Sequence, residues 1–290
     1  MTGIIQEQLG VLAFPLLPSE FHSRKVRIWI AGCGGTGSQV LSGLARLETC
    51  LKAVGHPGID VMAWDSDRVS SANVGRQLFS RADIGHAKAS ILIHRVNLWH
   101  GLSWSAMPER LDADCLERLR EYDLQQRRAD ILIGCVDSLA ARNDLAKACG
   151  AISSLRYWLD CGNDADTGQV VLGTVNQSHA EKLENVIRLP TILDLVRSVE
   201  GEGSRIVDDD QPSCSLAESL ERQSAFINQA IATVALDALW RMFRTGRIER
   251  SSWFVNMRMG LMASQSPTGP GKRVLEDSVA DGEEHPLTGN

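Results

Sequence analysis

Apolar runs and helical patterns alternate along the first part of the chain. Val26–Ala31 (VRIWIA) and Ile59–Trp64 (IDVMAW) are short and mostly apolar, which predicts two buried strands. The segment between them repeats apolar side chains at helical spacing, at Val40, Leu44, Leu47 and Leu51. A strand, a helix and a second strand in this order form a βαβ unit, in which the strands pair in parallel and the crossover is right-handed.

The same alternation continues to residue 175. It predicts helices at 85–98 and 139–149, and strands at 102–107, 130–136, 156–160 and 169–175. We therefore expect an α/β fold with a doubly wound, Rossmann-like, mostly parallel sheet that carries helices on both faces.

The pattern changes at residue 177. Residues 177–214 are polar and include three aspartates at 208–210, which favours a long crossover segment with one short helix near 190–199. A long helix with an apolar face is predicted over 215–243, where Ser215 and Glu218 form a capping box, and a last strand begins near 253.

The chain thus divides into three predicted parts. Residues 1–25 form an N-terminal extension, and residues 26–263 form one domain that contains the crossover segment. Residues 264–290 are rich in Pro, Gly and acidic residues, a composition typical of a disordered tail.

Composition and charge narrow the class of protein. With 290 residues, 43% of them hydrophobic, the chain can bury an ordinary globular core, and its formal net charge of -6 argues against a generic nucleic-acid binder. The seven cysteines include no C-x-x-C pair, which argues against a disulfide framework and a cysteine zinc site and favours a reducing cytoplasm. No apolar run approaches the ~20 residues of a membrane span, and no signal peptide is expected.

A glycine-rich loop provides the first functional signal. Gly32, Gly34 and Gly37 form G-x-G-x-x-G directly after a predicted strand and before a predicted helix, where the backbone can approach a phosphate. The loop lacks the Gly-Lys-Ser/Thr ending of a P-loop, so the phosphate charge must be met by side chains elsewhere. Asp65 ends the second strand, where an acid can accept hydrogen bonds from ribose hydroxyls.

Charged residues farther along the chain fit phosphate chemistry. Arg76 and Lys88 can neutralise a triphosphate, and Asp137, at the end of the strand predicted over 130–136, can hold Mg²⁺. A NAD-dependent oxidoreductase is an alternative interpretation, but it needs only the glycine loop and Asp65 and leaves Arg76, Lys88 and Asp137 unexplained.

These motifs carry a family resemblance. The segments GCGGTG, DSDRVSSANVGRQ, IGHAK and ILIGCVD follow one another in this order within residues 30–137. In this the chain resembles the adenylating domain of the ThiF/MoeB and ubiquitin-activating-enzyme superfamily, and within it the ThiF-like protein of the plasmid-associated PRTRC gene cassettes.

The resemblance implies ATP-dependent adenylation of the C-terminal carboxylate of a ubiquitin-like or sulfur-carrier protein that ends in Gly, by a homodimer that uses ATP and Mg²⁺. By motif position, Asp65 binds ribose and Asp137 holds Mg²⁺. The phosphate ligands implied in the same way are Asn73, Arg76 and Lys88, with Gln77 close by, and Gly35 lies against the adenylate.

Three features leave questions open. Cys214 precedes the helix predicted at 215 and resembles, by position, the cysteine that accepts the acyl group in some family members. A buried structural role is equally consistent with the sequence.

The N-terminal arginine stretch that a partner subunit often supplies is missing, which leaves Arg24 or Lys25 as candidates for its role. Its absence also keeps a non-catalytic nucleotide-binding protein as another alternative. The family's two zinc-binding C-x-x-C pairs are also missing, so no structural zinc is expected.

Overall fold

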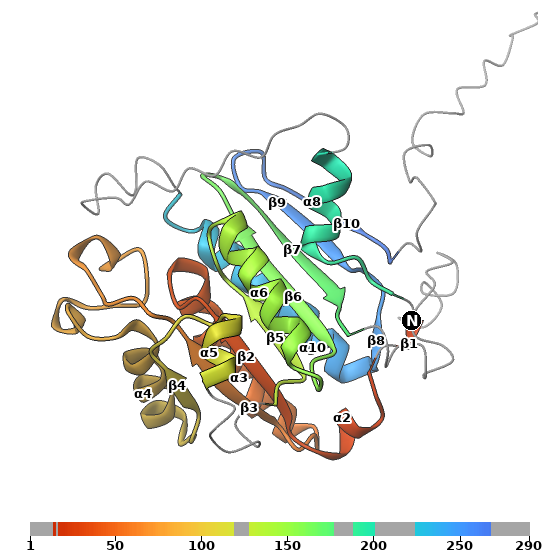
Figure 1. Ribbon diagram of the computed structural model, residues 1–290, viewed down its shortest axis with the longest axis horizontal. Coiled ribbons are helices and arrows are strands. Elements are labelled where there is room, and N and C mark those ends of the chain that lie inside the picture. Colours follow the sequence, from red (N-terminus) through yellow and green to blue (C-terminus); the bar gives the residue numbers. More distant parts are fainter. Residues whose placement is uncertain (1–13, 16, 119–127, 177–187, 201–223, 268–290) are drawn as a thin grey trace, which may run out of the picture.

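The computed structural model describes residues 14–15, 17–118, 128–176, 188–200 and 224–267 (Figure 1). Among these residues, no helix is long and apolar enough to cross a membrane.

An eight-stranded sheet forms the centre of the molecule, in the order β10-β9-β7-β6-β5-β2-β3-β4. Five strands pair in parallel: β2 (Val26–Ala31), β3 (Ile59–Trp64), β4 (Ser105–Met107), β5 (Ile131–Gly134) and β6 (Tyr157–Asn163). Three antiparallel strands extend one edge: β7 (Thr167–Thr174), β9 (Ser252–Asn256) and β10 (Leu261–Gln265). β1 (Phe14–Pro15) and β8 (Arg247–Ile248) form a separate two-stranded pair.

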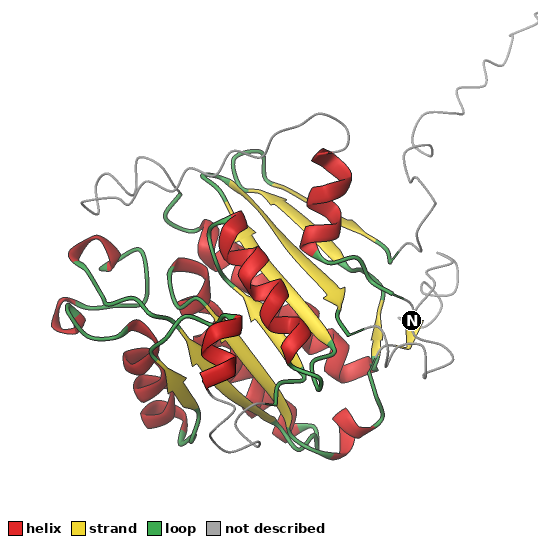
Figure 2. Ribbon diagram, in the orientation of Figure 1, coloured by secondary structure: helices red, strands yellow, loops and turns green. Residues whose placement is uncertain are grey.

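Helices cover both faces of the sheet (Figures 1 and 2). One face carries α3 (Gly35–Ala53), α4 (Lys88–His100) and α10 (Ile227–Thr245). The other carries α5 (Ala113–Arg118), α6 (Leu139–Ala151) and α8 (Ile192–Glu200). This arrangement confirms the predicted doubly wound α/β fold.

Alternating side chains of the strands supply two separate cores. In β2, Ile28 and Ile30 pack with α3 and α10, whereas Trp29 packs on the opposite face, where its ring lies 5.1 Å from that of Trp64. Because successive side chains of a strand point to opposite faces, both faces of a buried strand must be apolar. This explains why β2 and β3 were visible in the sequence as almost continuous apolar runs.

Several predicted boundaries need correction. The helix expected at 85–98 begins at Lys88, because Gly85 has a φ of +87°, outside the helical region, and belongs to the preceding turn. Ser224 to Phe226 are not helical, so the long C-terminal helix begins at Ile227, and residues 215–223 lie outside the described part. Ser264 and Gln265 belong to β10, so the last strand extends two residues past the predicted domain boundary at 263, and residues 268–290 lie outside the described part. The short helix α5 was not predicted at all.

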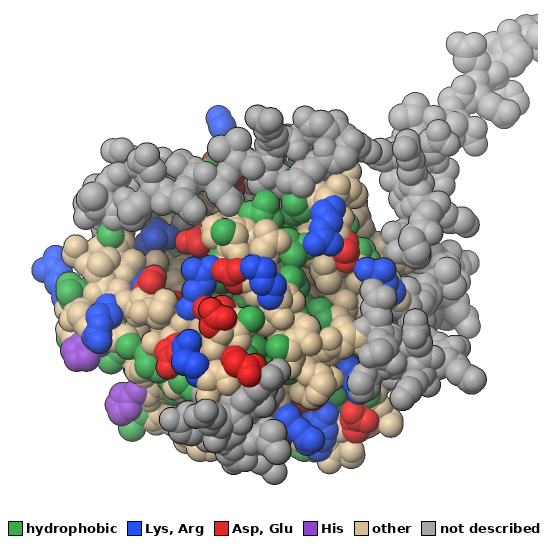
Figure 3. All heavy atoms as spheres, viewed as in Figure 1, with side chains coloured by type: hydrophobic (Ala, Val, Ile, Leu, Met, Phe, Trp, Pro, Cys, Tyr) green, Lys and Arg blue, Asp and Glu red, His purple; other side chains and the backbone are tan. Residues whose placement is uncertain are grey.

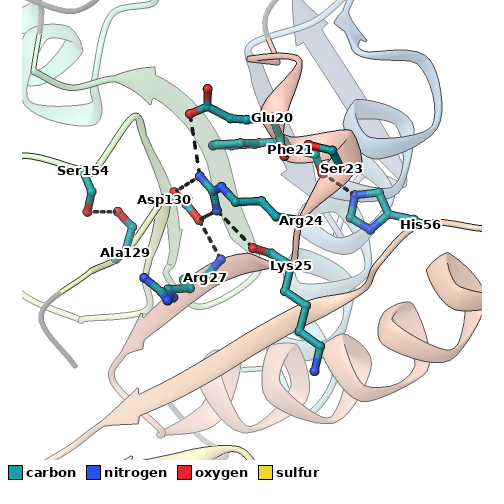
Figure 4. Close-up of polar contacts among 10 residues, drawn as sticks. All are labelled: Glu20, Phe21, Ser23, Arg24, Lys25, Arg27, His56, Ala129, Asp130 and Ser154. Atoms are coloured by element: carbon teal, nitrogen blue, oxygen red, sulfur yellow. Dashed lines mark hydrogen bonds and ion pairs between the residues drawn. The ribbon is translucent and has the colours of Figure 1, made fainter. Parts of the chain in front are cut away.

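The end of the predicted N-terminal extension packs onto the sheet. A short helix, α2 (Glu20–Ser23), places Phe21 in the core with no exposed surface. The guanidinium of Arg24 donates to both carboxylate oxygens of Asp130, at 2.7 and 2.8 Å, next to the beginning of β5 (Figure 4). Arg24 therefore has a structural partner within its own chain.

The surface over α5 and α6 carries charges of both signs (Figure 3). Asp144 of α6 pairs with Arg110 at 2.7 Å and with Lys147 at 3.1 Å, and Glu109 pairs with Arg118 at 2.7 Å. Exposed pairs of this kind contribute little to stability, but they give this face a mixed charge rather than a basic one.

One ion pair is buried. Both carboxylate oxygens of Asp160 in β6 lie 3.1 Å from the Nε of Arg142 in α6, and Asp160 is only 1% exposed. Burial raises the pKa of Asp160, while the charge and hydrogen bonds of Arg142 act against that rise. The pair joins α6 to β6 beside the end of β5.

We expect Arg142→Ala to lower the free energy of unfolding by about 3 kcal/mol, because the Asp160 carboxylate loses its buried cation. A raised folded-state pKa favours the fold at low pH, and that contribution is lost as the pH rises through the folded-state pKa. In urea titrations, Arg142→Ala should therefore lose more of its free energy of unfolding at about pH 8 than at about pH 5. Adding Asp160→Asn to Arg142→Ala should make that loss smaller, because no buried carboxylate then lacks its cation.

The matched control is Arg241→Ala, which breaks the exposed pair between Arg241 and Asp237 on α10. It should change stability by less than about 0.5 kcal/mol at either pH. Equal losses in the two variants would contradict the role given to burial.

Candidate functional site

A cavity of about 400 Å³ opens at the carboxyl ends of β2, β3 and β5. In a doubly wound sheet this edge, at the point where the strand order reverses, is the usual position of a ligand site. Eight of the predicted site residues line it: Gly32, Gly34, Gly35, Asp65, Arg76, Gln77, Lys88 and Asp137. Residues separated by more than a hundred positions in the sequence thus meet in one cavity.

Glycine is required by the shape of the loop at two positions. Gly32 has a φ of +90°, and a Cβ there would lie 2.5 Å from the carbonyl oxygen of Cys135. A Cβ on Gly37 would lie 1.8 Å from the carbonyl oxygen of Gly32, so Gly37 allows the first turn of α3 to pack on the loop. Gly37 does not itself line the cavity, and its role there is steric.

The other two glycines face different surroundings. A Cβ on Gly34 would have the Gln77 side chain as its nearest neighbour, at 3.9 Å, so the protein leaves open space at this position. A Cβ on Gly35 would come within 2.7 Å of the Asn228 amide. Gly34 is therefore the glycine that leaves room for a ligand next to the start of α3.

Asp65 connects the end of β3 to the glycine loop. Its carboxylate accepts the amide hydrogens of Cys33, at 2.6 Å, and of Asp67, at 2.7 Å. Burial raises the pKa of Asp65, and the hydrogen bond from Cys33 is the largest of the opposing effects. Asp65 lines the cavity while it holds the loop in place.

Lys88 is a nearly buried cation at the first position of α4. Its Nζ lies 2.8 Å from a carboxylate oxygen of Asp67, and its amide donates to the Asp67 carbonyl at 2.9 Å. The Lys88 side chain is 9% exposed and that of Asp67 is 65% exposed. No role was predicted for Asp67, although this residue lies within the segment DSDRVSSANVGRQ that carries the family resemblance.

The Arg76–Gln77 segment approaches the loop from the crossover between β3 and α4. Burial lowers the pKa of the Arg76 guanidinium. Gln77 is 6% exposed, and among the described residues its Oε1 has no hydrogen-bond partner. The Leu78 amide donates to the Ser38 hydroxyl at 3.3 Å, which ties this segment to α3.

Asp137 occupies the exposed end of the loop after β5. The next residue, Ser138, caps α6 by accepting the Ala141 amide hydrogen at 3.1 Å. The strand and the capped helix therefore fix the backbone on both sides of Asp137, whose side chain remains open to solvent at the rim of the cavity.

Of the other predicted residues, Asn73 is described by the structure and Cys214 is not. Asn73 does not line the cavity; its Oδ1 accepts the Ser70 amide hydrogen at 2.9 Å within the short 3₁₀-helix Ser71–Asn73. Cys214 lies outside the described residues, as do the aspartates at 208–210 and the capping box at 215–218.

A polar cluster in the wall of the cavity was not predicted from the sequence. The Thr36 hydroxyl lies 2.7 Å from Oδ1 of Asn163 and 2.9 Å from Oδ1 of Asn228, and all three residues line the cavity. The cluster joins the first turns of α3 and α10 to the end of β6. A polar residue next to the apolar core position Ile227 was the one signal that could have revealed Asn228.

The wall of the cavity also contains Trp64, which was predicted only as the end of a strand. Its indole Nε1 is buried and has no hydrogen-bond partner among the described residues. Two residues of the cavity wall thus carry a buried polar atom without a partner among the described residues, a donor on Trp64 and an acceptor on Gln77.

The thiols near the loop are poor nucleophiles. Burial raises the pKa of Cys33 well above its usual value, and the contact with Cys161 together with burial raises that of Cys135. All six described cysteines are free. Cys33 and Cys161 are buried and fill space in the core.

Fold and site together define an α/β protein of the doubly wound class with a polar cavity at its switch point. The ThiF family model matches residues 12–239, and the chain belongs to the ThiF family. No curated protein matches the sequence.

Solved structures share the fold at low sequence identity. The crystal structure of PaaA matches with a TM-score of 0.54 and 14% identity, over 84% of this chain and 73% of that chain. Escherichia coli MccB matches with a TM-score of 0.53 and 16% identity, over 88% of this chain and 68% of that chain. MccB solved with ATP matches with a TM-score of 0.52 and 17% identity, over 84% and 65% of the two chains.

The loop geometry predicts different outcomes for two glycine substitutions. Gly37→Ala should lower the free energy of unfolding by about 2 kcal/mol or more, because the added methyl group overlaps the Gly32 carbonyl. Gly150→Ala, in α6, should raise it by about 0.5 to 1 kcal/mol, because nothing lies within 4 Å of the new methyl group and alanine favours the helix. Urea titration measures both, and a stable Gly37→Ala variant would contradict the loop geometry.

Proposed function

We propose that this protein uses ATP and Mg²⁺ to adenylate the C-terminal carboxylate of a small ubiquitin-like or sulfur-carrier protein that ends in Gly. The observation that carries the proposal is the meeting of Arg76, Lys88 and Asp137 with the glycine loop in one cavity. A site that only binds a dinucleotide for hydride transfer does not need these three residues.

The cavity suits a nucleotide triphosphate. Its volume of about 400 Å³ lies within the usual range for small-molecule sites, and Gly34 leaves open space beside the amino end of α3. Trp64 Nε1 and Gln77 Oε1 offer buried polar atoms that a ligand can satisfy. Asp65, at the end of β3, would accept hydrogen bonds from ribose hydroxyls.

Arg76 and Lys88 would bind the phosphates, and Asp137, at the exposed rim, would hold Mg²⁺. Lys88 would exchange its contact with Asp67 for a phosphate oxygen, so its charge is already in position and loses little solvation on binding. The metal would supply further neutralisation of the phosphate charge.

The chemical step follows from this arrangement. A carboxylate oxygen of the partner forms a bond to the α-phosphorus, and the bond from that phosphorus to the pyrophosphate leaving group breaks. The protein contributes positioning and charge neutralisation, and no side chain has to accept or donate a proton. The hydrogen-bonded cluster of Thr36, Asn163 and Asn228 would keep one wall of the cavity in a fixed shape, and so help to hold the reacting groups in position.

Relatives of the same fold support a site for two substrates. MccB has been solved with ATP, and also with AMPCPP together with MccA. We extend this to a nucleotide and a second polypeptide in the present protein. Further parts of the proposal are a homodimer, a cytoplasmic location, membership of the PRTRC-associated subgroup and transfer of the acyl group to Cys214.

Arg24 does not support the role of a supplementary arginine, because its guanidinium is held by Asp130 at the amino ends of the strands. This favours a second candidate function, a nucleotide-binding protein without catalysis. The two functions differ in one outcome, since the second binds ATP but forms no AMP.

Adenylation predicts ATP–pyrophosphate exchange that depends on the partner protein. Arg76→Ala and Asp137→Ala should each lower the exchange rate by about a hundredfold or more, because a developing charge loses its counterion. The control is Arg81→Ala, which removes an exposed arginine from the same crossover and should leave exchange unchanged.

Exchange that survives in both site variants would show that the site is wrongly assigned. ATP–Mg²⁺ binding without exchange or AMP would favour the non-catalytic function. A larger rise in melting temperature with NAD than with ATP–Mg²⁺ would favour the oxidoreductase.

For Cys214, we expect a thiol-labile acyl adduct after incubation with ATP, Mg²⁺ and the partner, because a thiolate can attack the acyl-adenylate and displace AMP. Mass spectrometry should find the adduct in the parent protein and in Cys50→Ser, which removes an exposed thiol. It should be missing in Cys214→Ala. An adduct that persists in Cys214→Ala would exclude this residue from the mechanism.

A further inference from the structure

A second cavity, of about 470 Å³, lies at the opposite edge of the sheet. Its walls come from residues at the amino ends of strands: Arg24 and Lys25 precede β2, Asp130 precedes β5, and Arg156 precedes β6. Six residues of β2 separate this edge from the glycine loop, a rise of about 20 Å. The cavity is therefore distinct from the proposed nucleotide site.

Basic side chains dominate the lining. Among the described residues that line the cavity, five are cationic and three carry carboxylates: the cations are the four arginines 24, 27, 128 and 156 together with Lys25, and the carboxylates are those of Glu20, Asp60 and Asp130. The excess of two positive charges stands out on a chain with a formal net charge of -6. A concave, positively charged surface concentrates anions.

The carboxylate deepest in the cluster is already occupied. One oxygen of Asp130 accepts from Arg24 at 2.8 Å, and the other accepts from Arg24 at 2.7 Å and from the Arg27 amide at 2.8 Å (Figure 4). Asp130 is thus balanced by Arg24 and leaves little acceptor capacity for the other cations. Lys25 and Arg128 remain toward the rim of the cavity.

Arg156 supplies the observation that points to a ligand. Its Nη1 is shielded from solvent and has no hydrogen-bond partner among the described residues. A buried donor of a charged group without an acceptor is costly, and an arginine guanidinium matches the oxygens of a carboxylate or phosphate.

We propose that this cavity is a second ligand site, which binds the carboxylate or phosphate group of a small organic anion through Arg156. Its volume exceeds what a single oxyanion fills and lies in the range of small-molecule sites, which leaves room for an organic body. The site is independent of the adenylation proposed above, because it shares no lining residue with the first cavity.

The test is isothermal titration of the full chain at low ionic strength with inorganic phosphate and, separately, with succinate. The two arms distinguish a phosphate ligand from a carboxylate ligand. Arg156→Gln should weaken binding of the preferred anion about tenfold or more, since one charge-assisted contact is lost. Arg258→Gln, which removes an exposed arginine in the β9–β10 turn, should bind as the parent protein does.

Two further measurements separate this site from the first. Arg76→Ala should keep the binding that Arg156→Gln loses, and Arg156→Gln should keep ATP–pyrophosphate exchange. Without added anion, Arg156→Gln should melt no lower than the parent protein, because the removed donor has no protein partner. Unchanged anion binding in Arg156→Gln, no binding of either anion by the parent protein, or a lower melting temperature of Arg156→Gln without anion would each overturn the proposal.

Discussion

Two stretches of backbone approach each other closely, the glycine loop after β2 and the end of β5. Gly32 lies against the Cys135 carbonyl, and Gly37 lies against the Gly32 carbonyl, at distances that exclude a side chain at either position. Because parallel pairing brings the carboxyl ends of β2, β3 and β5 to one edge, this contact decides where the cavity opens. Asp65 then fixes the loop from β3 through the Cys33 amide.

The sequence predicted the parts of this structure that depend on local pattern. β2 and β3 were predicted residue for residue, since strands buried on both faces are short apolar runs with clear ends. The loop glycines, Asp65, Arg76, Lys88 and Asp137 were placed together because their order matched one family, and all of them except Gly37 of the loop line the cavity. Their individual roles in binding and catalysis stay predictions.

What the sequence could not predict depends on contacts between distant segments. The cluster of Thr36, Asn163 and Asn228 joins residues up to 192 positions apart, and a polar residue beside the core position Ile227 does not indicate which distant residues it contacts. The same holds for Arg24, whose partner Asp130 is 106 positions away. α5 was missed because its six residues are too few to show helical periodicity.

Charge is arranged differently at the two ends of the sheet. At the carboxyl end, the cations Arg76, Lys88 and Arg110 are matched in number by Asp65, Asp67 and Asp137, and Lys88 is held by Asp67. At the amino end, the cations exceed the carboxylates by two. At the carboxyl end, the balanced charges hold the cations in position without a large net field, so selection of a ligand there depends on geometry. At the amino end, the excess of cations produces a local field that acts on anions from a distance, until salt screens it.

The tryptophan in the cavity wall has an optical consequence. The indole of Trp64 lines the first cavity, and Trp29 lies behind it at 5.1 Å between ring centroids. Indole emission depends on the polarity and hydrogen bonding around Nε1, which has no partner among the described residues. A ligand that reaches this wall would change the emission of Trp64 directly. The fold thus contains an intrinsic fluorescent reporter of occupancy, and a Trp64→Phe variant would identify its share of the signal.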